Sequence, residues 1–178
     1  MRLPRTAQKK NKTAQTGMSL IETMVALALL LIVAAGVMSL AAVAMSTTEN
    51  QGHLGARTAE YAQDKMEQLL ALNYQDQCTD TTVYPAVIQS PCNGTLGLAA
   101  GGGLDPNAPV AGYSDYVDLS GNPVASTANW QYVRVWQITA NVTNDLKTIT
   151  VLTQVRADVG QPANLPRTTV ACLKSKPF

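Results

Sequence analysis

The longest apolar stretch of the chain begins a short distance after its N-terminus. No charged side chain occurs between Thr23 and Thr48. This stretch is longer than the roughly 20 residues that a helix needs to cross the hydrocarbon core of a bilayer. The pattern therefore predicts a helix that can span a membrane, from Met18 to about Ser46.

Polar and apolar residues then alternate at helical spacing up to about Asn73. Small or apolar side chains recur three and four residues apart with acidic and amide side chains between them, which is typical of a helix with one buried face. The predicted buried positions are Ala59, Ala62, Met66, Leu69, Leu70 and Asn73. A single helix from Met18 to Asn73 would be roughly 80 Å long, and Gly52 and Gly55 are the places where it could bend.

The last third of the chain has the period of two that is typical of β-strands. Three strands are predicted, at Trp130–Val142, Leu146–Arg156 and Thr168–Leu173, with a turn at Asn144-Asp145 between the first two. The first strand places one set of side chains on a common face, which we expect to pack on the helix: Trp130, Tyr132, Trp136, Ile138, Ala140 and Val142.

The segment between the helix and these strands, Tyr74–Asn129, has no clear period. It is rich in Asp, Asn, Pro, Ser and Gly, and we interpret it as a long loop with one short strand around Tyr113–Leu119. Its triple glycine, 101–103, is not followed by the Lys-Ser/Thr and helix that a phosphate-binding loop requires.

Composition and charge exclude some functions. About 130 residues follow the apolar stretch, enough for one small domain with a core. Five of the thirteen basic residues lie before Met18, so the chain after Gly17 contains eight basic and twelve acidic residues. This negative balance argues against binding to nucleic acid phosphates.

The basic residues also predict how the chain is oriented in a membrane. All five in the segment 1–17 lie together with no acidic residue, so the positive-inside rule places this end in the cytoplasm and the remainder outside it. Disulfides persist outside the cytoplasm, and we expect Cys78 to pair with Cys92, which closes a short loop. Cys172 is then either free and buried or the true partner of one of the others.

Catalytic and metal-binding patterns are weak. A Ser-His-Asp arrangement would have to use His53, the only histidine, and the cysteines lack the C-x-x-C spacing of a zinc site. Asp115 and Asp118 are close in sequence, but acids in a predicted loop are expected to face solvent. We therefore expect no enzyme activity, cofactor or metal.

One residue of the apolar stretch has chemistry that a plain membrane anchor does not need. Glu22 lies at its start, where removing a carboxylate without a partner from water is costly. An acidic residue at such a position is therefore interpreted as functional. The cations nearest in sequence are the lysines of residues 1–17, or a new amino group at Met18 if the chain is cut before it. The sequence around it is a basic segment that ends in Gly17, an apolar residue, and Glu22 as the fifth residue after the glycine.

These features resemble the type IV pilin superfamily, which includes the pseudopilins of type II secretion. The resemblance implies that prepilin peptidase cuts between Gly17 and Met18 and methylates the new N-terminus, and that Glu22 is the assembly carboxylate. Met18, where Phe is commoner, resembles minor pilins and I-type minor pseudopilins. The sequences Tyr132–Ile138 and Leu146–Val151 look like the sheet of minor pilins of the PilV type (type IV pilus modification protein).

The resemblance implies an α+β fold: a long N-terminal helix, with a transmembrane first half, packed on a small antiparallel sheet. It divides the chain into a cleaved leader (1–17), a transmembrane and assembly helix (18–46), an amphipathic helix (47–73) and a periplasmic domain (74–178). The implied role is a structural subunit of a type IV pilus, held in the bacterial inner membrane and assembled with other major and minor pilins or pseudopilins.

Three alternatives remain. The chain could be a minor pseudopilin of a type II secretion system, or a membrane-anchored periplasmic binding domain that never polymerises. Ala42-Val43-Ala44 also matches the cleavage site of a Sec signal peptide, which would make the protein a secreted one.

Overall fold

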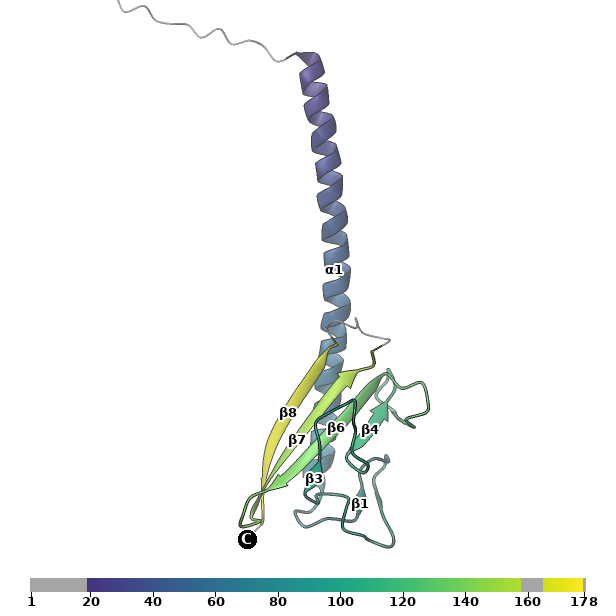
Figure 1. Cartoon of the computed structure of the whole chain (residues 1–178), viewed down its shortest axis with the longest axis vertical. Coiled ribbons are helices and arrows are strands. Elements are labelled where there is room, and N and C mark those ends of the chain that lie inside the picture. Colours follow the sequence, from purple (N-terminus) through teal and green to yellow (C-terminus); the bar gives the residue numbers. More distant parts are fainter. Residues whose placement is uncertain (1–18, 158–164, 178) are drawn as a thin grey trace, which may run out of the picture. The chain divides into compact units, whose positions relative to one another are not determined.

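The computed structural model describes residues 19–157 and 165–177, which contain one helix and eight strands (Figure 1). The chain divides into two units: the N-terminal unit ends at Ser46 and the C-terminal unit begins at Thr47. The helix α1, Leu20–Ala71, contributes residues to both.

The predicted long helix is present and passes through Gly52 and Gly55. Met18, its predicted first residue, lies outside the described part of the chain. The helix ends two residues before Asn73, and its last turn has no basic residue to complement the negative end of the helix dipole. Lys174 supplies the charge from elsewhere: its Nζ donates hydrogen bonds to the carbonyl oxygens of Leu70, at 2.6 Å, and Leu72. These bonds satisfy carbonyls that the helix itself leaves free.

Most of the strands form one antiparallel sheet. Its order is β5-β4-β6-β7-β8, and β3 also pairs with β6, beyond the end of β4. The bounds are β3, Gly101–Gly102; β4, Ser114–Val117; β5, Pro123–Val124; β6, Tyr132–Ala140; β7, Leu146–Val155; and β8, Arg167–Ser175. The three strands predicted near the C-terminus are confirmed, and Asn144 has the positive φ, 50°, of a tight turn between β6 and β7.

The middle of the chain is more ordered than we predicted. The expected short strand is β4, but the segment also forms β3, β5 and a separate hairpin made of β1, Thr79–Asp80, and β2, Val87–Ile88. Strands of two residues leave no periodic pattern in a sequence. The prediction of one strand in a long loop was therefore wrong.

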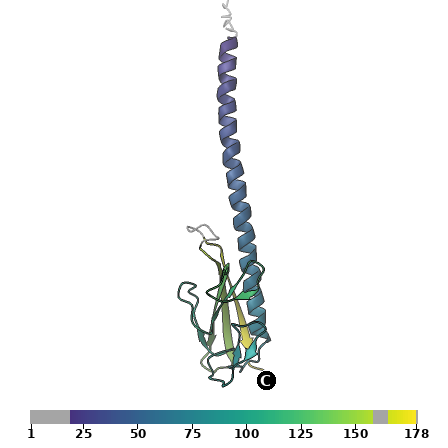
Figure 2. The same ribbon diagram turned by 90° about the vertical axis from the view of Figure 1, so that its right-hand side faces the viewer.

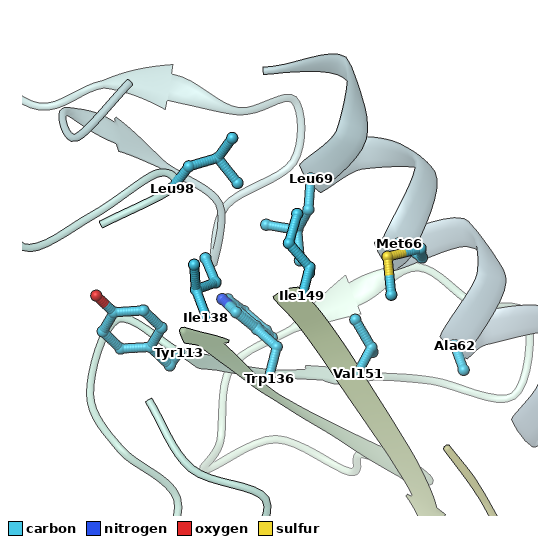
Figure 3. Close-up of a cluster of buried hydrophobic side chains, with 9 residues drawn as sticks. All are labelled: Ala62, Met66, Leu69, Leu98, Tyr113, Trp136, Ile138, Ile149 and Val151. Atoms are coloured by element: carbon cyan, nitrogen blue, oxygen red, sulfur yellow. The ribbon is translucent and has the colours of Figure 1, made fainter. Parts of the chain in front are cut away.

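The hydrophobic core lies between the sheet and residues 47–71 of α1 (Figure 3). Trp136 is fully buried at its centre, where Tyr113 and Leu98 also lie. The predicted helix face is confirmed for its three central members, Ala62, Met66 and Leu69, whereas Asn73 is exposed beyond the helix end. Figure 2 shows the sheet from the side, with this part of α1 along it.

Two residues assigned to the helix-facing side of the first strand do not lie there. Trp130 precedes β6 and packs on the opposite face of the sheet, beside Val133, Val135 and Tyr116. Val142 follows β6 and is fully exposed. The period of two holds only within a strand, and β6 is shorter at both ends than the apolar pattern suggested.

The predicted disulfide is present. Cys78 and Cys92 are bonded, with 5.1 Å between their Cα atoms, while Cys172 is a free thiol, half-buried on β8. Together the long helix and the antiparallel sheet confirm the α+β, type IV pilin-like layout.

The triple glycine generates a first prediction. Gly102 has φ +82°, and a Cβ added there would meet the carbonyl oxygen of Trp136 and lie 2.8 Å from the ring of Tyr113, whereas a Cβ on Gly103 would only touch Val110 at 3.5 Å. Gly102→Ala is therefore expected to lower the free energy of unfolding by about 2 kcal/mol or more, and Gly103→Ala by about 1 kcal/mol or less.

The measurement is denaturant unfolding of the full chain in detergent, followed by tryptophan fluorescence. Equal midpoints for the two variants would contradict the close approach of Gly102 to β6.

Candidate functional site

The part of α1 that belongs to the N-terminal unit exposes almost its whole apolar surface. The large hydrophobic side chains between Leu20 and Met45 are 53–78% exposed. By length and composition, this part of α1 can cross a membrane. In water such a surface would be strongly unfavourable, so this unit requires lipid or other proteins around it.

Three hydroxyl groups of α1 within this unit already have partners. Thr23 and Ser39 each donate to the carbonyl oxygen three residues earlier at 2.8 Å, and Ser46 does so at 3.0 Å. A hydroxyl bonded within its own helix adds no unsatisfied donor in lipid. These hydroxyl groups therefore add no polar group that needs water to the apolar surface of the helix.

Glu22 is the exception. It is the one ionisable side chain between Ser19 and Ser46, and it is exposed in the first turn of α1. The backbone N–H groups of Glu22 and Thr23 bond to the carbonyl of Ser19, and the positive end of the helix dipole favours a carboxylate there. Within the described residues Glu22 forms no ion pair, so its predicted role needs a cation from elsewhere.

Gly17 and Met18, the predicted cleavage and methylation positions, lie outside the described residues. Their relation to Glu22 therefore rests on the sequence alone.

Residues 12–38 match the family described as the prokaryotic N-terminal methylation motif. The match covers Gly17, Met18 and Glu22 together with the first half of the apolar stretch. This motif is typical of type IV pilins and pseudopilins, whose precursors are substrates of prepilin peptidase. Comparison with curated proteins and with solved structures gives no significant match.

The C-terminal unit contains a buried cluster of charges that the sequence did not suggest. Asp115 on β4 binds Arg134 on β6 through two hydrogen bonds, 2.7 Å to Nε and 2.8 Å to Nη2, and binds Lys65 on α1 at 2.6 Å. All three side chains are almost fully buried. Asp64, which is half-exposed, completes the cluster at 3.0 Å from Nη1 of Arg134.

Lys65 makes further contacts that hold its buried side chain in the cluster. Lys65 donates to the carbonyl oxygen of Thr81 at 2.6 Å and lies over the ring of Trp136 at 4.7 Å. Burial lowers the pKa of Lys65, and the neighbouring Asp115 opposes this shift. Because the folded pKa lies below the unfolded one, the unfolded chain binds more protons between these two values, and stability arising from Lys65 rises with pH in that window.

Our interpretation of Asp115 as a solvent-facing loop acid was wrong. Asp115 lies within β4 and faces the helix, whereas Asp118 lies in the next turn and accepts hydrogen bonds from the backbone of Ser120 and Asn122. The positions of the two cations in the sequence could have indicated this cluster. Arg134 is two residues from both Tyr132 and Trp136, and Lys65 lies beside Met66 on the buried face of the helix. Polar residues at core-facing positions predict a paired charge.

Beside this cluster a groove of about 490 Å³ opens between α1, the β4–β5 turn and Tyr84. Its lining is polar and includes Glu60, Asp64 and Glu67, but Arg57 pairs with Glu60 at 3.0 Å and Arg134 with Asp64. His53 is exposed. No group of three potential metal ligands exists among the residues that the structure describes.

The cluster generates a second prediction. Asp115→Asn removes the buried anion that pairs with two buried cations, so the free energy of unfolding should fall by about 3–5 kcal/mol. Asp64→Asn, at a half-exposed position of the same cluster, should cost about 1 kcal/mol or less. Urea unfolding of the full chain in detergent measures both, and a smaller loss for Asp115→Asn than for Asp64→Asn would contradict the assigned burial.

Proposed function

We propose that the chain is a minor pilin: a structural subunit that prepilin peptidase processes and that is assembled from the inner membrane into a type IV pilus. The observation that carries this proposal is the methylation motif over residues 12–38, which joins a basic leader, Gly17 and Glu22 to a helix with an exposed apolar surface. A subunit of this kind needs no catalytic site.

In the proposed organisation, residues 1–17 are the cleaved leader and remain in the cytoplasm. Residues 18–46 cross the inner membrane while the subunit is stored there. They later pack against the corresponding helices of other subunits. Residues 47–73 and 74–178 form the periplasmic part, where the oxidising environment supports the bond between Cys78 and Cys92. Prepilin peptidase and other pilins are the partners.

Cleavage explains why Glu22 and the new N-terminus act together. The cut before Met18 removes the leader lysines and creates a positive amine, while Val25 and Ala26, one turn beyond Glu22, offer no charge. The amine and Glu22 are about a turn apart in one chain and need not face each other. Each therefore finds its better partner on a neighbouring subunit, and this pairing sets the axial position of one helix against the next.

The same motif is typical of pseudopilins, so a minor pseudopilin of a type II secretion system is the alternative. It shares every processing and assembly step above and differs in the filament that it joins. Purifying the filament that contains this chain, and determining whether it is a type IV pilus or a pseudopilus, distinguishes the two roles.

The experiment that tests the proposal is the mass of the mature chain isolated from membranes. We expect an N-terminus at Met18 with one added methyl group on its amine. An intact Met1 would indicate an anchored domain that is not processed, and a start after Met45 would indicate a secreted protein.

The role of Glu22 generates a further prediction. Glu22→Ala makes the apolar stretch more hydrophobic and leaves Gly17 in place, so the variant should still insert and still be cut. Its amount in sheared filaments, relative to membranes, should fall severalfold because the amine of a neighbouring subunit loses its counter-charge. Thr23→Ala is the matched control. Thr23 is the residue next to Glu22, and its hydroxyl bonds to the carbonyl of Leu20 in its own helix.

The measurement is the filament-to-membrane ratio of each variant, with cleavage checked by mass. An unchanged ratio for Glu22→Ala would show that the subunit is held in the filament by other contacts.

A further inference from the structure

The groove beside the buried charge cluster has the size of a ligand site. Its volume is about 490 Å³, and it lies between α1, the turn after β4 and Tyr84. Sites for small organic ligands are concave and measure roughly 300–1,000 Å³. All of its lining residues belong to the C-terminal unit. The groove can therefore accept a small organic ligand, and its lining indicates the class.

Two side chains that line the groove are held in fixed positions. The side chain of Arg134 is 1% exposed and donates hydrogen bonds to Asp115 and Asp64. The hydroxyl of Tyr61 donates to the carbonyl oxygen of Leu119 at 2.9 Å. A ligand that binds here does not have to order these groups, which lowers the entropic cost of binding.

The charges along the groove favour a neutral ligand. Its lining contains three carboxylates, those of Glu60, Asp64 and Glu67, which repel an anion. A cation is not required, because Glu60 already pairs with Arg57 at 3.0 Å and Asp64 with Arg134 at 3.0 Å. Of the three, only Glu67 has no ion pair among the residues that the structure describes.

Several polar side chains of the groove remain able to form hydrogen bonds. Those of Gln63 and Glu67 are exposed and have no hydrogen-bond partner within the described part of the chain. Asn122 donates its side-chain amide to Asp118 at 3.1 Å, which leaves its carbonyl oxygen as an acceptor. Donors and acceptors are thus mixed along the groove. Hydroxyl groups suit such a surface, because each one both donates and accepts.

Tyr84 adds an aromatic ring to this polar surface. It is 64% exposed although it lines the groove. Tyrosine presents an apolar ring face beside a polar hydroxyl. A sugar has the matching chemistry, since C–H groups cover a face of its ring and hydroxyl groups surround its edge. A neutral sugar therefore fits the charge, the hydrogen-bonding groups and the aromatic ring of the groove together.

We propose that the groove binds a neutral carbohydrate, with a sugar ring stacked on Tyr84 and its hydroxyl groups bonded to Gln63 and Glu67. The side-chain carbonyl of Asn122 accepts a further hydroxyl. The inference goes beyond the proposed function, because it gives the C-terminal unit a binding activity that does not depend on processing or assembly. In a filament subunit, the site would attach the filament to a surface that carries polysaccharide.

Binding of defined sugars to the purified full-length chain tests the inference. The detergent has a polyoxyethylene headgroup, because maltoside and glucoside detergents would compete for the site. The neutral probes are cellobiose, maltose, lactose and N,N′-diacetylchitobiose; sialyllactose is the anionic relative of lactose, and spermidine is the cationic probe. Saturation-transfer NMR should show contact with the ring C–H protons of at least one neutral disaccharide, and weaker contact with sialyllactose and spermidine.

Substitutions at exposed positions locate the site. Tyr84→Ala should lower the affinity for the bound disaccharide severalfold because the stacking face is lost, whereas Tyr84→Phe should preserve it. Gln63→Ala should also lower the affinity. Ile88→Ala is the matched control, since Ile88 lies on the same hairpin, is 78% exposed and does not line the groove. Unfolding midpoints check that each variant keeps the fold.

No contact with any of the neutral disaccharides would overturn the inference, as would an equal loss of affinity in Tyr84→Ala and Ile88→Ala. Tighter binding of spermidine or sialyllactose than of every neutral probe would assign the groove to a charged ligand and would also overturn it. The mass of the mature chain, measured separately, tests the proposed function. A processed chain that binds no sugar contradicts this inference alone, and sugar binding by a chain that retains Met1 contradicts the proposed function alone.

Discussion

The arrangement of the C-terminal unit depends on the carboxylate of Asp115. It binds a lysine of α1 and an arginine of β6 from its own place on β4, so three elements that are distant in sequence share one anion. A buried ion cluster adds little stability compared with apolar residues of the same size, but any shift that separates its charges is costly. Asp115 therefore fixes which face of the helix meets the sheet, while the apolar contacts around Trp136 supply most of the attraction.

The fold class could be predicted because the two sequence patterns that define it extend over many residues. The apolar stretch and the amphipathic residues that follow it continue over more than ten helical turns, and β6 and β7 each repeat the period of two several times. Such patterns average over local exceptions. The ends of elements could not be predicted equally well: Trp130 and Val142 continue the apolar pattern beyond the first and last residues of β6.

The candidate sites divide in the same way. Glu22 was found because a charge within an apolar stretch is conspicuous and needs no knowledge of the fold. Asp115 was missed because acids in this part of the chain were interpreted as solvent-facing, although Lys65 and Arg134 lie at core-facing positions and require a buried anion. The hairpin from Thr79 to Ile88 was equally hidden, since strands of two residues are defined by their pairing alone.

The end of α1 also constrains the order in which the C-terminal unit folds. The carbonyl oxygen of Leu70 accepts a hydrogen bond from Lys174, 104 residues later in the chain. Because Lys174 lies on β8, which follows the other strands of the sheet in sequence, this cap forms only once β8 has joined the sheet. Contacts between such distant residues form slowly. The capped end of α1 is therefore a late feature of folding, and its presence reports that the sheet is complete as far as β8.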